Sequence, residues 1–153
     1  MTASVADIQT IAQRGATLNV KLTNDDLIPM LIVLNQKDEI GIYLLEVPKF
    51  SIVDAIAEQL EINDAKAYGL VVEAFATEFC DAAINDYNYR VRDMPPDDIY
   101  EAVQIVVVER NKGIVSSSIA TINRPDAHTK ELEPWMDSTE TAITSESMLI
   151  TQW

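Results

Sequence analysis

Three consecutive serines are the side chains in this chain that most resemble a reactive centre. Ser116, Ser117 and Ser118 lie in the second of two apolar runs, and the single histidine, His128, follows in the next segment. A serine hydroxyl becomes a nucleophile when a histidine beside it takes the proton, but the glycines of a nucleophile elbow are missing here. Positions 114, 116, 118, 120 and 122 alternate as one face of a strand. We therefore interpret the serines as small residues that let a helix approach closely.

Metal ligands are present only as scattered residues. A zinc site would need Cys80, His128 and carboxylates from distant segments, and no spacing supports one. Three acidic pairs would suit a hard cation, although none has the glycine and terminal glutamate of a calcium loop. The pairs are Asp25 with Asp26, Asp38 with Glu39, and Asp97 with Asp98. We interpret them as solvated turns and Cys80 as a buried small hydrophobe, and we expect no metal and no cofactor.

One local cluster combines aromatic rings with positive charge. Residues 87–92 contain Tyr87, Tyr89, Arg90 and Arg92 within a long connection. Tyrosine and arginine are the residue types that anchor protein interfaces. The alternative is that the rings pack on the core while the arginines neutralise nearby aspartates. We predict these four residues as the interaction site.

The net charge limits the partners of this protein. At 153 residues with a formal net charge of −14 and 48% hydrophobic residues, the chain is a globular, acidic protein with one core. Such a surface repels phosphate backbones, so we expect no direct nucleic-acid binding. The charge has three interpretations: repulsion that keeps the protein soluble, adaptation to high salt, or mimicry of DNA. No apolar run approaches the roughly 20 residues that cross a bilayer, and one cysteine suits a reducing compartment, so we expect a cytoplasmic protein without membrane contact.

The first half of the chain is predicted to contain two helices and a hairpin. A capping box at Ser4 and Asp7 begins a short helix that Gly15 ends, and residues 17–22 are expected to be extended. Two apolar runs, 30–34 and 40–47, flank a polar turn, which is typical of a hairpin. A second capping box starts a helix over 51–61.

The second half is predicted to be mostly strands. A central strand at 67–79 has apolar residues on both faces, and a long connection separates it from a hairpin of 103–109 and 114–123. Gly113 supplies the positive backbone angle that this hairpin turn needs. Residues 126–146 are polar and are expected to form a flexible or linker-like segment. The hydrophobic end, 148–153, is expected to add an edge strand or to dock on a neighbouring chain.

The order of these segments resembles that of small uncharacterised proteins of bacteria and their phages. The resemblance is one of layout and spacing, and it runs from PMLIVLNQKDEIGIYLLEV through SIVDAIAEQL, LVVEAFATEF and DMPPDDIYEAV to ATINRP. Those proteins carry a tryptophan after the Glu-Ala of the central strand and an arginine before the penultimate hairpin. This chain has Phe75, and Ile99 or Tyr100, at those places. The resemblance implies no catalytic residues.

We therefore expect a single α+β domain over residues 1–153. Its antiparallel sheet carries one main helix on one face, and the short N-terminal helix is peripheral. The leading functional hypothesis is a non-enzymatic interaction or structural module that associates with itself or another protein through an apolar terminus or sheet edge. The alternatives are a small-molecule or metal-dependent enzyme that uses Asp97 and Asp98, and an acidic DNA mimic that inhibits a DNA-binding protein.

Overall fold

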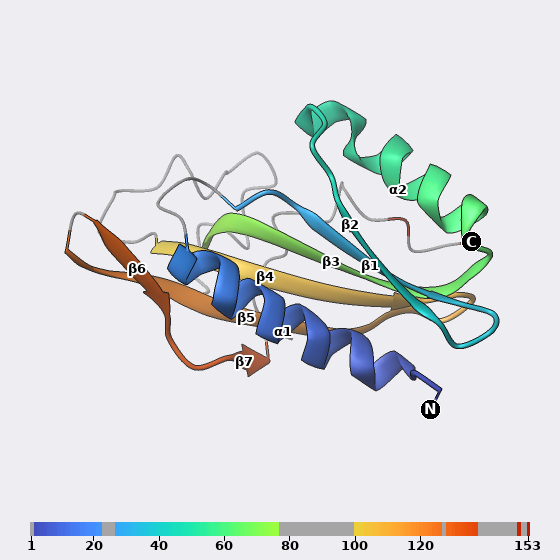
Figure 1. The fold of residues 1–153 in the computed structure, drawn as a ribbon, viewed down its shortest axis with the longest axis horizontal. Helices are drawn as coiled ribbons and strands as arrows, with labels where there is room; N and C mark the ends of the chain where they lie inside the picture. The colour runs from blue at the N-terminus through green and yellow to red at the C-terminus, as the bar shows by residue number, and fades with distance from the viewer. Residues whose placement is uncertain (1, 23–26, 77–99, 127, 138–149, 151–152) are drawn as a thin grey trace, which may run out of the picture.

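An antiparallel, curled sheet with a helix on each face forms the core of this computed structural model (Figure 1). The structure describes residues 2–22, 27–76, 100–126, 128–137, 150 and 153. The strand order is β2-β1-β3-β4-β5-β6, and β7 pairs with β5 beside this path. The helical elements are α1 (Val5–Leu22), the 3₁₀ turn η1 (Lys49–Ser51) and α2 (Ile52–Ile62). The strands are β1 (Met30–Asn35), β2 (Ile40–Leu44), β3 (Ala65–Ala76), β4 (Tyr100–Glu109), β5 (Gly113–Asp126), β6 (Thr129–Leu132) and β7 (Met136–Asp137).

The N-terminal helix is longer than the sequence pattern predicts. The predicted stop at Gly15 and the extended segment after it are wrong, because α1 continues for 18 residues to Leu22. Its buried side chains recur every four residues and continue past Gly15 to Ala16 and Val20, so burial against the sheet outweighs the low helix propensity of glycine. Gly15 lies against Met30, whose Cε would be 3.1 Å from an added Cβ.

The first capping box is confirmed in part. The Asp7 carboxylate accepts hydrogen bonds from the backbone N–H of Ser4 at 2.7 Å and from its hydroxyl at 3.2 Å. At the second predicted box Ser51 makes no capping bond with its side chain, because it is the last residue of η1 and already has helical backbone angles. The helix itself is confirmed, at Ile52–Ile62 instead of 51–61.

Both faces of the sheet are covered. On one face, Ile8, Ala12, Ala16 and Val20 of α1 pack on alternate residues of the strands, including Ile105. On the other face, the three buried residues of α2 pack on the intervening residues of β1, β3 and β4; they are Ile52, Ile56 and Leu60. The prediction that the N-terminal helix is short and peripheral is therefore wrong, since α1 covers a face of its own.

Gly69, in the central strand β3, lets α1 lie close to the sheet. A Cβ added at Gly69 would be only 2.5 Å from Cγ2 of Ile8. The strand pairs with β1 on one side and β4 on the other, which confirms its predicted central position.

The second hairpin turns as predicted. Gly113 has φ of 78° and Asn111 has φ of 66° at the turn between β4 and β5. Beyond it, the described part of range 126–146 contains β6 and β7, which both pair with β5. Among the described residues, no helix is long and apolar enough to cross a membrane.

Candidate functional site

The predicted interaction residues lie outside the described part of the structure. Tyr87, Tyr89, Arg90 and Arg92 all fall in the range 77–99, which the structure does not describe. The same holds for Cys80 and for the acidic pairs at 25–26 and 97–98. The site must therefore be sought among the remaining residues.

The structure places Ser118 in the interior and His128 at the surface. Ser118 is 1% exposed, and its hydroxyl has no hydrogen-bond partner among the described residues. His128 is exposed in the turn between β5 and β6, where its backbone N–H donates to the Asp126 carboxylate at 2.8 Å. This bond lowers the pKa of the Asp126 carboxyl, with a further contribution from the Thr129 side chain. The interpretation of the serines as small residues that let a helix approach stays a prediction. Ser116 and Ser118 pair with Val107 and Ile105, which belong to the cluster that packs against α1. The close approach that the structure shows is between Gly69 of β3 and Ile8 of α1.

The acidic pair that the structure describes, Asp38 with Glu39, lies in a turn that an ion pair and hydrogen bonds stabilise. Asp38 forms an ion pair with Lys66, and its backbone carbonyl accepts a hydrogen bond from the N–H of Ala3 at 3.1 Å. Asn35 caps the same turn, since its side-chain oxygen accepts from the N–H groups of Lys37 and Glu39 at 2.9 Å each. Among the described residues, no three histidine, cysteine or acidic side chains are grouped to hold a metal ion.

A buried ion pair joins the central strand β3 to the last strand of the order, β6. Lys130 of β6, whose side chain is 1% exposed, lies 3.5 Å from the Glu73 carboxylate of β3. The second oxygen of Glu73 accepts from the backbone N–H of Leu27 at 3.1 Å. All of these partners are protein groups that hold elements together, so we assign the pair a structural role.

Tyr68 holds the end of the chain against the α2 face. Its hydroxyl donates to the carbonyl of Ile150 at 2.7 Å and accepts from the N–H of Ile150 at 2.8 Å, and its ring centroid is 5.4 Å from that of Trp153. Burial raises the pKa of Tyr68 to about 12, although the hydrogen bond to Ile150 acts in the opposite direction. The described residues of the hydrophobic end thus pack on a sheet face.

The strand β2 presents an open edge. It is the first strand in the sheet order, and in the described structure it pairs only with β1. Hydrogen bonds join Asn35 N–H to the Glu39 carbonyl at 3.0 Å and Leu45 N–H to the Pro29 carbonyl at 2.8 Å. Because such bonds alternate along an antiparallel pair, Gly41 and Tyr43 also face β1. The backbone groups of Ile40, Ile42 and Leu44 therefore point outward.

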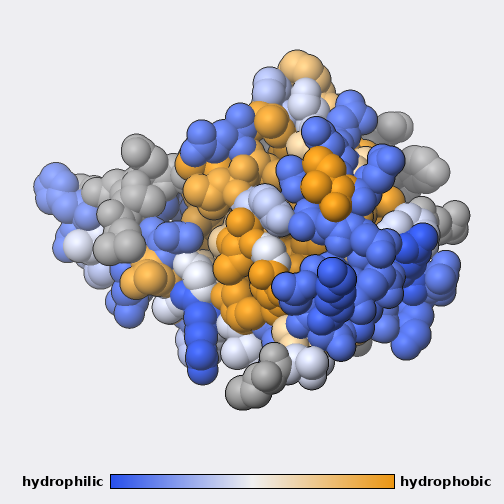
Figure 2. All heavy atoms as spheres, turned by 45° about the vertical axis from the view of Figure 1, so that its right-hand side comes forward, coloured by the Kyte–Doolittle hydropathy of each residue, from blue (hydrophilic) through white to orange (hydrophobic). Residues whose placement is uncertain are grey.

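The side chains of this edge are apolar and uncharged. Ile42 is 54% exposed and Leu44 is 56% exposed, on the same face of the strand. On the other face the ring of Tyr43 covers Gly41, so that an added Cβ would be 2.8 Å from the tyrosine oxygen. Figure 2 brings forward the side of the molecule where β2 and α2 lie and shows a broad apolar patch there, bordered by hydrophilic residues. Natural edge strands usually carry a charge, a proline or a bulge that prevents pairing, and Ile40–Leu44 has none of these.

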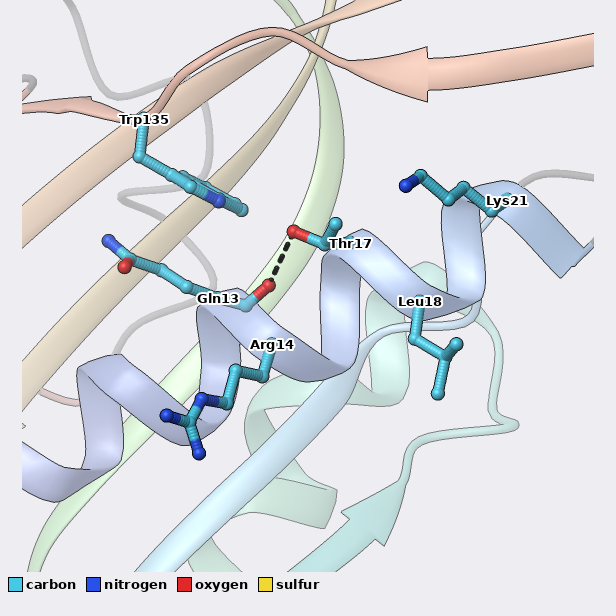
Figure 3. A pocket seen from close by; sticks show the side chains of 6 residues that line it. All are labelled: Gln13, Arg14, Thr17, Leu18, Lys21 and Trp135. Carbon is cyan, nitrogen blue, oxygen red and sulfur yellow. Dashed lines mark hydrogen bonds between the residues drawn. The ribbon is translucent and has the colours of Figure 1, made fainter.

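A groove lies over the exposed side of α1. Its volume is about 400 Å³, and Figure 3 shows the indole of Trp135 over Gln13 and Thr17 of the helix. The other lining residues are Arg14, Leu18 and Lys21. Thr17 is engaged, since its hydroxyl donates to the Gln13 carbonyl at 2.8 Å. Among the residues that the structure describes, no acidic side chain lines this groove, although the chain as a whole is strongly acidic.

Sequence reasoning missed both of these surfaces, and the signal for each was present. The segment IGIYL has no charge and no proline, which marks an unprotected edge once the strand order is known. Arg14, Leu18 and Lys21 recur at the helical spacing of four and three residues, but the expected stop at Gly15 excluded two of them from any helix.

The chain matches no known protein-family model, no curated protein and no solved structure.

Proposed function

We propose that this protein is a non-enzymatic module that associates with itself by pairing the β2 edges of two copies. The observation that supports the proposal is the open, apolar and uncharged edge of β2. Three residues there direct backbone N–H and C=O groups outward, and a strand edge with these properties is a template for pairing with another strand.

The edge is compatible with its own copy. If two β2 strands meet antiparallel about a twofold axis at Ile42, then Ile42 lies opposite Ile42 of the other copy, and Ile40 lies opposite Leu44. All three outward-facing residues then exchange backbone hydrogen bonds, because directly opposed residues of this class form the bonded pairs. The exposed side chains of Ile42 and Leu44 pack against their equivalents on one face, which removes apolar surface from water.

The net charge of the protein opposes this contact, and it predicts how the association should depend on salt. Each copy carries a formal charge of −14, so two copies repel each other at low ionic strength. The contact itself is uncharged, and added salt screens only the repulsion. We therefore expect association through β2 to strengthen as salt is raised.

Ile42→Lys tests the proposal. It places two lysines opposite each other at the twofold axis and should remove the twofold dimer, which lowers the average mass in sedimentation equilibrium. Hydrogen exchange at high protein concentration should show slow amides at Ile40, Ile42 and Leu44 in the native chain and fast ones in the variant.

Val115→Lys is the matched comparison. It adds the same charge at a strand residue of β5 that is 42% exposed, and it should leave the dimer intact. A native protein that stays monomeric at every concentration and salt, or a dimer that Val115→Lys dissociates and Ile42→Lys does not, would show that the β2 edge is not the contact.

A further inference from the structure

The outer surfaces of the two helices carry complementary patterns. On α1 an arginine, a leucine and a lysine are exposed in the order Arg14, Leu18, Lys21, and Leu18 is 59% exposed. On α2 an aspartate, an alanine and a glutamate are exposed in the order Asp54, Ala57, Glu61. From Lys21 back to Arg14 along α1, the three residues are spaced by three positions and then by four. From Asp54 forward to Glu61 along α2, the spacing is the same. Each pair of charges is thus separated by two helical turns, roughly 10 Å.

We propose that α1 of one copy docks antiparallel on α2 of a second copy. In this register Lys21 meets Asp54, Leu18 meets Ala57, and Arg14 meets Glu61. The occupant of the α1 surface is therefore a second copy of this chain, and the contact adds to the β2 pairing without depending on it.

The charges of both surfaces are available for this contact. The ion pairs within the described structure join other residues and involve neither Arg14 and Lys21 nor Asp54 and Glu61. Arg14 and Lys21 both line the groove, in a protein whose net charge is −14. Because these two side chains are positive, an acidic surface is electrostatically complementary to the groove.

The shapes of the two surfaces also agree. Leu18 lies between Arg14 and Lys21 along the helix and is 59% exposed, and in the proposed register its facing position on α2 is an alanine, which lets the two helix axes come close. The groove of about 400 Å³ beside Trp135 leaves space next to α1, on the side that Gln13 and Thr17 line. A helix lying along α1 would fill part of this space with its side chains.

The two helices cover opposite faces of the sheet, so this contact is head-to-tail. A head-to-tail contact repeats from copy to copy and produces an open chain of molecules unless the rotation closes a ring. Salt screens the two local attractions of this contact as well as the net repulsion between copies, whereas the β2 contact contains no attraction between charges that salt could screen.

Disulfide trapping tests the register. All proteins carry Cys80→Ser, and a Leu18→Cys copy is mixed with a differently tagged Ala57→Cys copy under mild oxidation. We expect the mixed disulfide to form at least tenfold faster than when Thr10→Cys replaces Leu18→Cys, because Thr10 is exposed on the same side of α1 but lies out of register. Equal rates would refute the proposed contact.

Charge reversal tests what holds the contact together. Arg14→Glu with Lys21→Glu in the first copy should slow trapping about tenfold at low salt, as expected when two exposed attractions become repulsions. Asp54→Lys with Glu61→Lys in the second copy should then restore it. A failure of the second change to restore trapping would overturn the proposal.

Two controls separate the outcomes. Lys37→Glu with Arg110→Glu changes the net charge equally at two exposed residues outside the groove and should leave trapping unchanged. Ile42→Lys should also leave trapping unchanged, so that failure of β2 pairing is distinguished from failure of this contact. If charge reversal has no more effect than the Lys37 and Arg110 control, then a second copy is not the occupant of the α1 surface.

Discussion

The contact between Tyr68 and the end of the chain predicts an unusual dependence of stability on pH. Tyr68→Phe keeps the buried ring and removes the hydroxyl that both donates to and accepts from Ile150. Near neutral pH the variant loses these two hydrogen bonds. At about 1 kcal/mol net for each bond, or less where water replaces it at the half-buried Ile150, the variant should be destabilised by roughly 1–2 kcal/mol.

At high pH the sign reverses. Burial raises the pKa of Tyr68 from 10.0 to about 12 in the folded protein, so between these values the folded chain keeps a proton that the unfolded chain releases. The stability that Tyr68 provides is therefore complete below pH 10 and is lost as pH rises through 12. The loss amounts to about 2–3 kcal/mol for two pKa units. Since Tyr68→Phe has no such loss, the two stability curves should cross at about pH 11.

Urea unfolding of both proteins across this pH range measures the effect. The difference between the two curves isolates Tyr68, because the other groups that titrate at alkaline pH are shared. Tyr43→Phe is the control: it removes a hydroxyl that hydrogen-bonds to Asn63 at 2.8 Å but leaves Tyr68 in place, so the alkaline loss should persist. If the Tyr68→Phe curve stays below the native curve at all pH values, the account of Tyr68 as a buried, neutral anchor is wrong.

Three substitutions test other parts of the core by equilibrium unfolding. Gly69→Ala should cost about 1–3 kcal/mol through overpacking against Ile8, and Ile8→Ala should remove part of that cost in the double variant, so additive effects would contradict the close approach. Glu73→Ala should cost about 3 kcal/mol by leaving Lys130 without this partner, whereas the pair Glu73→Leu with Lys130→Met should recover much of the loss. Ser118→Ala should be neutral or stabilising by up to about 1 kcal/mol, and a clear loss of stability would show that its hydroxyl is needed.

Local patterns predicted most elements of this fold. Alternation and turn residues indicated both hairpins, and the apolar residues on both faces of the segment at β3 indicated its central place. The α2 helix was predicted to within one residue at each end, since its apolar side chains recur at helical spacing and proline and polar residues bound it. These features depend on near neighbours in sequence, which is why the chain alone reveals them.

The errors arose where long-range packing outweighed local propensity. Gly15 has the local character of a helix stop, but in the folded chain it lies against Met30, and burial of Ala16 and Val20 extends the helix. The sequence reasoning considered the small residues of β5 and did not mark Gly69, where an added Cβ would be 2.5 Å from Ile8. Such outcomes depend on which distant strand lies under a helix, and periodicity contains no information about that.

The candidate site was the least predictable part. Aromatic and charged residue types drew attention to residues 87–92, whereas the surfaces that the described structure presents are a strand edge and a helix face. An edge is defined only when the strand order is known. The complementary pattern of the two helices can be recognised only when the residues that form it are known to be exposed.

The sequence by itself determined the α+β class, the antiparallel hairpins, the α2 helix and the acidic surface, because these follow from composition and from periodicity over a few residues. Only the tertiary structure decided that α1 covers one face of the sheet and that β2 is an edge strand whose outward backbone groups are unpaired in the described structure. It also decided that Tyr68 forms hydrogen bonds with Ile150. The reason is physical: burial, strand order and exposure are properties of contacts between distant segments, and their free energies exceed the local preferences that a sequence displays.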